Sequence, residues 1–408
     1  REQLAQRKRE REQLAQKRII YEQALNYEIH MDRAKAFALY CQAADMGYPL
    51  AMMKMGDCYY YGRGVVQDYS RALVWYQKAA ENGVTEACAK IDDVKETYLK
   101  KMQDLKMNLS LIEYYQLVQQ DADNGNALAV SMLNSMLNNL SAQESNKIAL
   151  AYMGTKDYEQ AVKWFRKAAD QGVDEAQYNL GLCYYAGLGV TQNYTSAVEY
   201  FRKAAEQGVD EAQYNLGLCY YAGLGVTQNY TSAVEYFRKA AEQGNVKSIT
   251  YLGNCYEKGL GVKANFRKAV SYYQQAADNG YAEAQYQLGL CYVGRWGELD
   301  KIPAFKTDVE TFRNEYKAVK WFRKAADQGH VKAQYNLGMC YMGLGDYQSA
   351  ATWFQIAANN GDSDAQCNLG NCYLGGYGVP KNVEYAKYWY QQAAKQGNER
   401  AAVLLRKF

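Results

Sequence analysis

The sequence is poor in the residues that interrupt helices and in those that most often perform acid–base chemistry. Only 3 of its 408 residues are proline, and only two, His30 and His330, are histidine. No run of 18 uncharged apolar residues occurs, so the sequence offers no membrane-spanning helix. Scarce proline together with frequent Ala, Gln, Lys and Glu indicates a mostly helical chain.

The excess of positive charge is confined to the start of the chain. Residues 1–18 carry seven Lys or Arg against three Glu, a balance of +4, and the remaining residues sum to −1. A nearly neutral body gives no electrostatic reason to expect nucleic acid as a partner. We interpret residues 1–31 as a solvated basic helix continuing a missing upstream segment, because the chain begins with Arg1 rather than Met. A polybasic juxtamembrane segment and a nucleic-acid-binding arm are the alternatives, and membrane contact is expected only through such an upstream segment.

A repeat of 36 residues dominates the rest of the sequence. Residues 173–208 and 209–244 are identical letter for letter. Diverged or length-altered copies occupy residues 48–83, 245–280, 281–329, 330–361 and 362–397. A two-helix repeat of this size cannot bury its own apolar faces, so neighbouring repeats are expected to stack and share one core.

Each repeat predicts two helices with an apolar stripe of helical period. The stripes are Ala176, Leu180, Cys183 and Tyr184 in the first helix, and Ala197, Phe201, Ala204 and Ala205 in the second. Gly181 lies beside the first stripe, where a missing side chain lets another helix approach closely. Gly187 and Gly189 are expected to end the first helix.

The sequence also suggests how the helices begin. Asp174 and Gln177 are spaced as a capping-box pair at the start of the first helix. Asn193 is expected to cap the second helix. The same position is filled elsewhere by Asp68, Asn229, Asn265, Asp346 and Asn382.

These features predict an all-α solenoid of stacked helix pairs. We expect first repeats in residues 32–83, preceded by a half repeat ending in Lys35–Gly47, and a regular array in 173–408 that ends in a capping helix. Degenerate repeats are expected in 84–172, where Lys95–Tyr115 and Leu128–Tyr152 are interpreted as longer helices. A hinge between two arrays is the alternative for 84–172; one solenoid is favoured because no Pro- or Gly-rich linker intervenes.

The signature A-x-Y-x-L-G-x-C-Y-x-x-G-x-G-V, followed by N-Y-x-x-A-V-x-Y-F-x-K-A-A-x-x-G, resembles the Sel1-like repeat, a relative of the tetratricopeptide repeat. It recurs in register over six to seven repeats. The resemblance implies a right-handed superhelix whose first helices line a concave face used to gather protein partners.

By analogy with tetratricopeptide arrays, the residues flanking the Leu-Gly pair of each first helix are predicted to face the partner. Tyr and Asn combine rigid apolar area with adaptable hydrogen bonding, as recognition surfaces do. The predicted residues are Tyr178, Asn179, Leu182, Tyr185, Tyr214, Asn215, Leu218, Tyr221, Tyr251, Asn254, Tyr286, Gln287, Tyr335, Asn336, Met339, Asn368 and Asn371. Packing between repeats is the alternative for the tyrosines.

The 49-residue repeat carries an insertion at about residues 295–316. It contains Trp296, Phe305 and Phe312. Insertions in solenoids map to loops on one side, often the binding side, so this insertion is a candidate specificity feature. The alternative is a surface loop that is tolerated without a role in binding.

The sequence contains few groups of residues that could bind a metal ion or a cofactor or carry out catalysis. Seven of the ten cysteines, including Cys183 and Cys219, occupy one position of the repeat, so they lack zinc-site spacing and are interpreted as small core residues. Members of the repeat family that are secreted pair a cysteine in each helix, and this pattern is missing here, which favours a reducing, cytoplasmic compartment. His330 is interpreted as a solvated helix-start residue. The G-x-G pairs follow helices rather than strands, which argues against a dinucleotide site.

We therefore predict a non-enzymatic scaffold that binds a protein or an extended peptide, with no catalytic residue, metal, cofactor or small-molecule substrate. The alternative is a regulatory or substrate-recruiting arm of a larger enzyme whose catalytic domain precedes residue 1.

Overall fold

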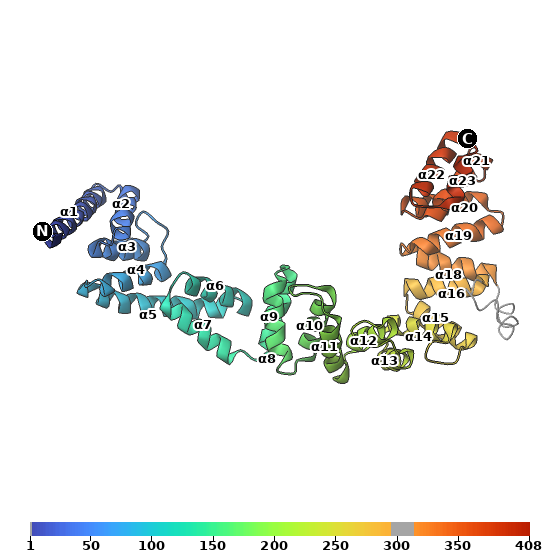
Figure 1. Ribbon diagram of the computed structural model, residues 1–408, viewed down its shortest axis with the longest axis horizontal. Helices are drawn as coiled ribbons and strands as arrows, with labels where there is room; N and C mark the ends of the chain where they lie inside the picture. The colour runs from blue at the N-terminus through green and yellow to red at the C-terminus, as the bar shows by residue number, and fades with distance from the viewer. Residues whose placement is uncertain (1, 295–313) are drawn as a thin grey trace. The chain divides into compact units, whose positions relative to one another are not determined.

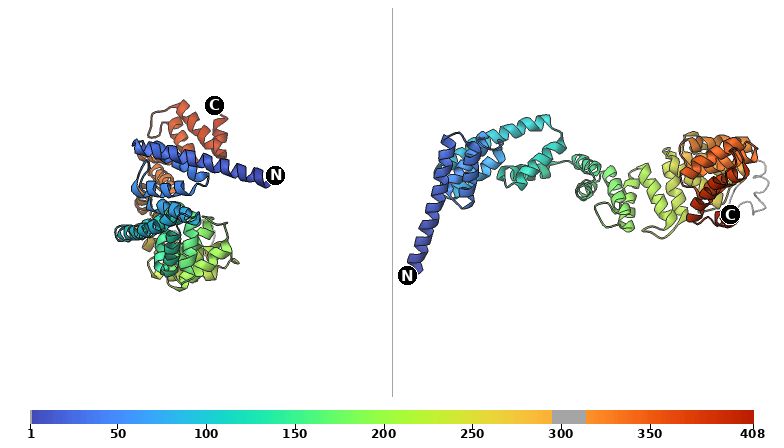
Figure 2. Two further views of the ribbon diagram at one scale, coloured as in Figure 1. Left: turned by 90° about the vertical axis from the view of Figure 1, so that its left-hand side faces the viewer. Right: turned by 90° about the horizontal axis from the view of Figure 1, so that it is seen from above.

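The computed structural model describes residues 2–294 and 314–408, and over these residues it contains helices and no strands (Figure 1). The chain divides into two compact units, an N-terminal unit of residues 1–156 and a C-terminal unit of residues 157–408. In the C-terminal unit consecutive helices lie side by side, as the views in Figure 2 also show. The predicted all-α solenoid of stacked helix pairs is confirmed.

The N-terminal unit contains α1 (Glu2–Ile29), α2 (Arg33–Asp45), α3 (Pro49–Tyr61), α4 (Tyr69–Glu81), α5 (Thr85–Asn108), α6 (Leu111–Asp123), α7 (Ala127–Asn139) and α8 (Ala142–Gly154). The C-terminal unit begins with α9 (Tyr158–Ala169), α10 (Asp174–Ala186), α11 (Tyr194–Glu206), α12 (Asp210–Ala222), α13 (Tyr230–Glu242), α14 (Val246–Lys258), α15 (Phe266–Asp278) and α16 (Ala282–Val293). It continues with α18 (Glu315–Asp327), α19 (Val331–Gly343), α20 (Tyr347–Asn359), α21 (Ser363–Gly375), α22 (Val383–Lys395) and α23 (Glu399–Leu405).

The predicted caps of the second helices are confirmed. The side chain of Asn193 accepts a hydrogen bond from the backbone N–H of Ser196, which satisfies one of the free donors at the start of α11. The same bond is made by Asp68, Asn229, Asn265, Asp346 and Asn382. Asn314 caps α18 in this way as well, so the second helix of the longest repeat starts like the others.

In seven helix pairs of the described residues, a glycine of the first helix faces an aromatic ring of the second. A Cβ atom added to Gly217 would lie 2.7 Å from the ring of Phe237, and one added to Gly181 would lie 2.6 Å from Phe201. Both rings are completely buried. The glycine therefore sets how closely the two helices pack, as its place beside the apolar stripe predicted. Tyr184 of that stripe is only partly buried, whereas Ala176, Leu180 and Cys183 are fully buried.

The predicted capping box at the start of the first helix is wrong. Residue Val173 caps α10 without any side-chain bond, and Gln177 is buried instead. Its amide Nε2 donates to the backbone carbonyl of Ala169, in the last turn of the preceding repeat, at 3.2 Å. Its Oε1 accepts a hydrogen bond at 2.7 Å from Nε2 of Gln207. Gln207 directly follows α11, the second helix of the same repeat.

This arrangement recurs, and we call it the glutamine ladder. Each buried glutamine of a first helix joins the ends of two successive second helices. The buried members are Gln177, Gln213, Gln285, Gln334 and Gln366, and their side-chain partners are Gln207, Gln243, Gln328, Asn360 and Gln396. The repeat at 245–280 has Ile249 at this position, so the ladder is interrupted there.

The N-terminal unit departs from the sequence-based expectations at two helix boundaries. The two long helices predicted in 95–115 and 128–152 are each broken, at Ser110 and at Ser141. Each serine forms a capping box with the glutamate three residues later, which starts a new helix. The first repeat is also not a half repeat, because Ala24 in the second half of α1 is buried in one cluster with Ala36 and Tyr40 of α2.

We expect replacement of Gln213 by Ala to lower the free energy of unfolding by roughly 1–3 kcal/mol. The change removes two buried hydrogen bonds between helix ends and leaves a small void. Urea denaturation followed by circular dichroism measures the effect. Thr227→Ala is the matched control, because Thr227 is exposed and its loss should cost no more than about 0.5 kcal/mol. Equal midpoints for the two variants would contradict a structural role for the ladder.

Candidate interaction surface on the first helices

The predicted binding residues in the C-terminal unit lie on six first helices, α10, α12, α14, α16, α19 and α21, and most of them are partly exposed. Tyr178, Asn179, Leu182 and Tyr185 of α10 belong to this group, as do their copies on α12. Tyr178, Leu182 and Tyr185 also pack against the buried cluster formed by α11 and α12. These side chains therefore contribute to packing between repeats and keep part of their surface accessible. Which of them contact a partner remains a prediction.

The tyrosines on this surface form contacts from one first helix to the next. Tyr214 of α12 and Tyr251 of α14 have ring centroids 5.8 Å apart, and Tyr221 lies at the same distance from Tyr251. Tyr251 in turn stacks on Phe237 at 5.2 Å. On α12 and α14 these rings form an aromatic strip, whereas Tyr178 of α10 meets the amide of Asn215 instead.

Two of the predicted asparagines are buried, which contradicts the expectation that they face a partner. Asn336 is 7% exposed and donates to the backbone carbonyl of Lys332 at 2.8 Å. Asn368 is 8% exposed, and its Nδ2 lies 3.3 Å from the Sδ atom of Met339. Both side chains are turned into the helix stack, so little of either can reach a partner.

Two further asparagines are engaged by buried tyrosines. The hydroxyl of Tyr273 donates to Oδ1 of Asn254 at 2.6 Å, and that of Tyr390 donates to Oδ1 of Asn371 at 2.7 Å. In the N-terminal unit Tyr76 bonds to Asp57 in the same way. The Oδ1 atoms of Asn254 and Asn371 are thus already hydrogen-bonded to tyrosine hydroxyl groups of the core, which makes them less available to a partner.

The residue type at the position of Asn254 and Asn371 depends on which aromatic residue of the second helix faces the glycine of the first helix. Repeats with tyrosine there have Asn or Asp on the first helix, and repeats with phenylalanine have an apolar residue. The apolar pairs are Leu182 with Phe201, Leu218 with Phe237, Leu290 with Phe322, and Met339 with Phe354. Sequence reasoning missed this pairing, although the co-variation between repeats was present in the sequence to find it.

Glu257 and His330 are the other polar groups of this surface with an unusual environment. Burial raises the pKa of Glu257, whose Oε2 lies 2.6 Å from the Tyr273 hydroxyl, so that Asn254 and Glu257 share the single proton of this hydroxyl. His330 is not the solvated residue that the sequence suggested. Its Nδ1 accepts the backbone N–H of Ala333 and so caps α19, while its Nε2 lies 3.0 Å from Oε2 of Glu283. The hydrogen bond from His330 is the main reason that the pKa of Glu283 is lowered.

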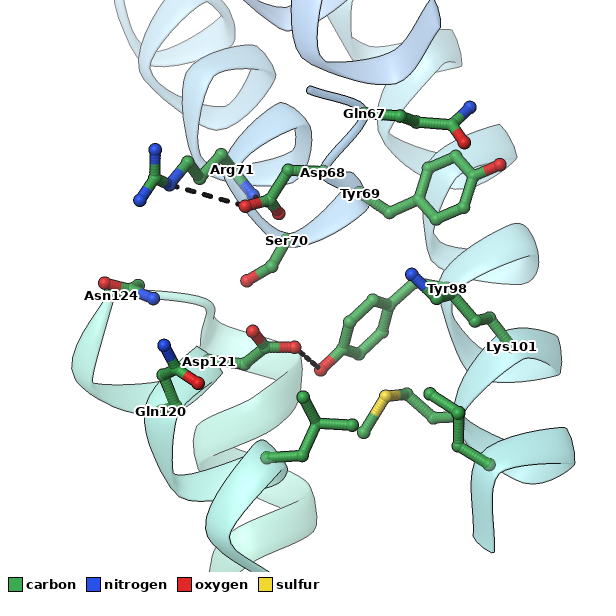
Figure 3. Close-up of a pocket in the computed structure, with 13 residues that line it drawn as sticks. Gln67, Asp68, Tyr69, Ser70, Arg71, Tyr98, Lys101, Gln120, Asp121 and Asn124 are labelled. Atoms are coloured by element: carbon green, nitrogen blue, oxygen red, sulfur yellow. Dashed lines mark hydrogen bonds and ion pairs between the residues drawn. The ribbon is translucent and has the colours of Figure 1, made fainter. Parts of the chain in front are cut away.

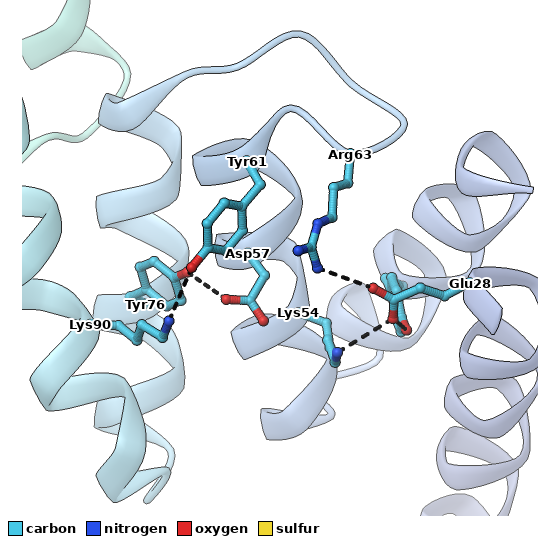
Figure 4. A network of polar contacts seen from close by, with 8 residues as sticks. Glu28, Lys54, Asp57, Tyr61, Arg63, Tyr76 and Lys90 are labelled. Carbon is cyan, nitrogen blue, oxygen red and sulfur yellow. Dashed lines mark hydrogen bonds and ion pairs between the residues drawn. The ribbon is translucent and has the colours of Figure 1, made fainter. Parts of the chain in front are cut away.

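The N-terminal unit carries a polar network that the sequence did not reveal (Figure 4). Glu28 of α1 accepts from the buried Tyr40 at 2.6 Å and pairs with Lys54 at 3.3 Å and Arg63 at 3.6 Å. Burial would raise the pKa of Glu28, but these three partners lower it below the ordinary value. Beside it, Lys90 contacts the hydroxyl of Tyr61 at 3.4 Å. The N-terminal unit therefore carries charged side chains in this region, whereas the candidate surface of the C-terminal unit carries aromatic side chains.

The cysteines are packed as core residues. Of the seven at the repeated position, all except Cys340 are buried, and burial raises the pKa of Cys183 to about 11. Within the described residues no three His, Cys, Asp or Glu side chains are grouped so that they could hold a metal ion. No helix in the described part of the chain is long and apolar enough to cross a membrane. Trp296, Phe305 and Phe312 lie outside the described residues.

Comparison with known proteins identifies the family. The Sel1 repeat matches residues 21–48, 49–84, 148–173, 174–209, 210–245, 246–281, 282–301 and 363–398, more than half of the chain. The chain belongs to the Sel1 repeat family. A tetratricopeptide repeat matches residues 317–366.

Solved structures of Sel1 repeat proteins resemble this one. The protective antigen c5321 of uropathogenic Escherichia coli, described as displaying an SLR fold, is 31% identical with a TM-score of 0.60, over 97% of this chain and 81% of that chain. A Sel1 repeat protein from Oxalobacter formigenes is 31% identical with a TM-score of 0.52, over 61% of this chain and 96% of that chain.

Curated relatives match over shorter stretches. The chitin synthase regulatory factor 3 of Schizosaccharomyces pombe is 29% identical over 38% of this chain and 16% of its own length. The DAP3-binding cell death enhancer 1 of Rattus norvegicus is 38% identical over 39% of this chain and 28% of its own length. The matched region thus spans less than a third of either relative.

We expect Phe237→Tyr to destabilise the Sel1 array by roughly 1–3 kcal/mol, because the added hydroxyl is buried beside Leu218 without a partner. The double variant Leu218→Asn/Phe237→Tyr recreates the pair found at Asn254 and Tyr273 and should recover much of that loss. A double-mutant cycle in urea measures the coupling. A coupling energy of zero would show that the pairing of residue types between repeats has no energetic basis.

Proposed function

We propose that the chain is a non-enzymatic scaffold that binds a protein or an extended peptide along the first helices of its C-terminal unit. Sel1 and tetratricopeptide repeat folds generally serve as protein-interaction scaffolds, and stacked repeats provide the extended surfaces for this. The observation that carries the proposal is the partly exposed aromatic strip on α12 and α14, next to which lie Tyr178, Asn179 and Asn215 on α10 and α12.

The chemistry of the strip favours an uncharged, extended segment of polypeptide. Tyrosine rings supply large contact areas at a small cost in side-chain entropy. The amide of Asn179 is partly exposed, and that of Asn215 makes only a long contact of 3.4 Å with the hydroxyl of Tyr178. Both amides can therefore bond to the backbone of a bound peptide.

The regulatory-arm alternative is favoured by one observation, the similarity to a protein named as a regulatory factor of chitin synthase. In that role the same surface would recruit an enzyme or its substrate. A reducing, cytoplasmic location, to which the unpaired buried cysteines are suited, remains a further prediction.

Affinity capture with mass spectrometry tests the proposal on the double variant Asn179→Ala/Asn215→Ala. We expect a defined set of proteins bound by the unmodified chain to be lost or reduced about tenfold, since each lost amide bond contributes about 0.5–1.5 kcal/mol. The urea midpoint should not change, because among the described residues neither amide has a short hydrogen-bond partner.

The matched control is Thr195→Ala/Thr231→Ala, which changes exposed residues on the second helices of the same two repeats. It should retain all partners. Loss of the same partners in the control, or retention of every partner by the asparagine variant, would contradict binding on the first helices.

A further inference from the structure

A cavity of about 250 Å³ lies between the start of α4 and the facing sides of α5 and α6 in the N-terminal unit (Figure 3). Its wall includes Asp68, Tyr69 and Ser70 from α4 and its cap, Tyr98 and Lys101 from α5, and Asp121 from α6. These side chains are predominantly polar. The cavity therefore suits a polar guest of side-chain size, and it is separate from the first-helix surface of the C-terminal unit.

Asp121 is the negative group of this cavity that lacks a full counterpart. Its carboxylate accepts a hydrogen bond from the hydroxyl of Tyr98 at 2.7 Å, and among the described residues it forms no ion pair. Burial raises the pKa of Asp121, and the neighbouring charge of Asp68 adds to this effect against the opposing influences of Tyr98, Lys101 and the Ser70 hydroxyl. A carboxylate in such surroundings is stabilised by any cation that can approach it.

The other charged groups in the wall are already engaged. Asp68 uses its carboxylate to cap α4 through the backbone N–H of Arg71 at 2.9 Å, and it pairs with the Arg71 guanidinium at 3.4 Å. The ammonium group of Lys101 lies 5.3 Å from the centre of the Tyr69 ring. The wall thus accommodates a cation over an aromatic face, although the cation there does not pair with Asp121.

We propose that this cavity binds a guanidinium or ammonium group, with Asp121 as its counter-ion and the rings of Tyr69 and Tyr98 beside it. Such a group is carried by an arginine or lysine side chain of a partner protein and by small free amines. It would form charge-assisted hydrogen bonds with Asp121, which are about twice as strong as neutral ones. A calcium ion fits less well, because it requires about six to eight oxygen ligands.

Binding of acetyl-arginine-amide to the whole chain tests the proposal, with acetyl-citrulline-amide as the neutral probe of the same shape. The carbon-13-labelled methyl group of Met102, which lines the cavity, reports occupancy by NMR, and Met102→Leu assigns its signal. We expect the arginine probe to shift this signal and the citrulline probe to leave it unchanged. Agmatine, a free amine with the same guanidinium group, distinguishes a small ligand from a side chain of a partner by which probe binds more tightly.

Two variants change the affinity in opposite directions. Asp121→Asn should weaken arginine binding about tenfold through loss of the charge-assisted bond, and Lys101→Met should strengthen it because a like charge is removed. Asp123→Asn is the matched control, since Asp123 is exposed on the same helix and its loss alters net charge equally. Thermal melts establish that each variant is folded.

Three results would overturn the proposal. The first is equal binding of the arginine and citrulline probes, and the second is an equal loss in Asp121→Asn and Asp123→Asn. The third is binding of acetyl-glutamate-amide that disappears in Lys101→Met, which would make this an anion site. The Lys101→Met variant decides between cation and anion even if Asp121→Asn does not fold.

Discussion

The contact between a helix glycine and the aromatic ring of the following helix is the constraint on which seven of the described helix pairs depend. The rings of Phe201, Phe237 and Tyr273 are fully buried, and each contributes about 1.5–3 kcal/mol from burial alone. A side chain in place of the glycine would occupy the space of the ring, so the two helices could not pair at this distance. Cysteine and alanine on the same stripe serve the same purpose, because small residues keep neighbouring helices close.

This core contact also determines what the surface can present. Where the ring belongs to tyrosine, its hydroxyl requires a polar partner on the first helix, and Asn254 or Asn371 supplies it. Where the ring belongs to phenylalanine, an apolar residue such as Leu218 takes that place. One position of the candidate surface is therefore selected by the core, and only the residues around it are free to adapt to a partner.

The repeats in the sequence predict most of the helices and their caps. The predictions that are wrong share a physical cause. Helix caps such as Asn193 and glycines such as Gly181 act within one repeat, so the local pattern predicted them. Gln177 was misread because its hydrogen-bond partners lie in the preceding repeat and 30 residues further along. His330 was misread for the same reason, since its partner Glu283 lies in another repeat. Contacts between repeats depend on stacking, which a single repeat does not encode.

The two identical repeats illustrate how stacking diversifies a surface. Tyr178 and Tyr214 have identical sequence neighbours, but the next first helix offers Asn215 to the former and Tyr251 to the latter. One tyrosine hydroxyl therefore meets an amide, while the other ring meets a second ring. Since each repeat contacts only its neighbours, duplication of a repeat supplies stable core packing without copying the site. The chemistry at each point of the candidate surface then belongs to a pair of repeats, and a partner that contacts α10 and α12 encounters two different sites built from one sequence.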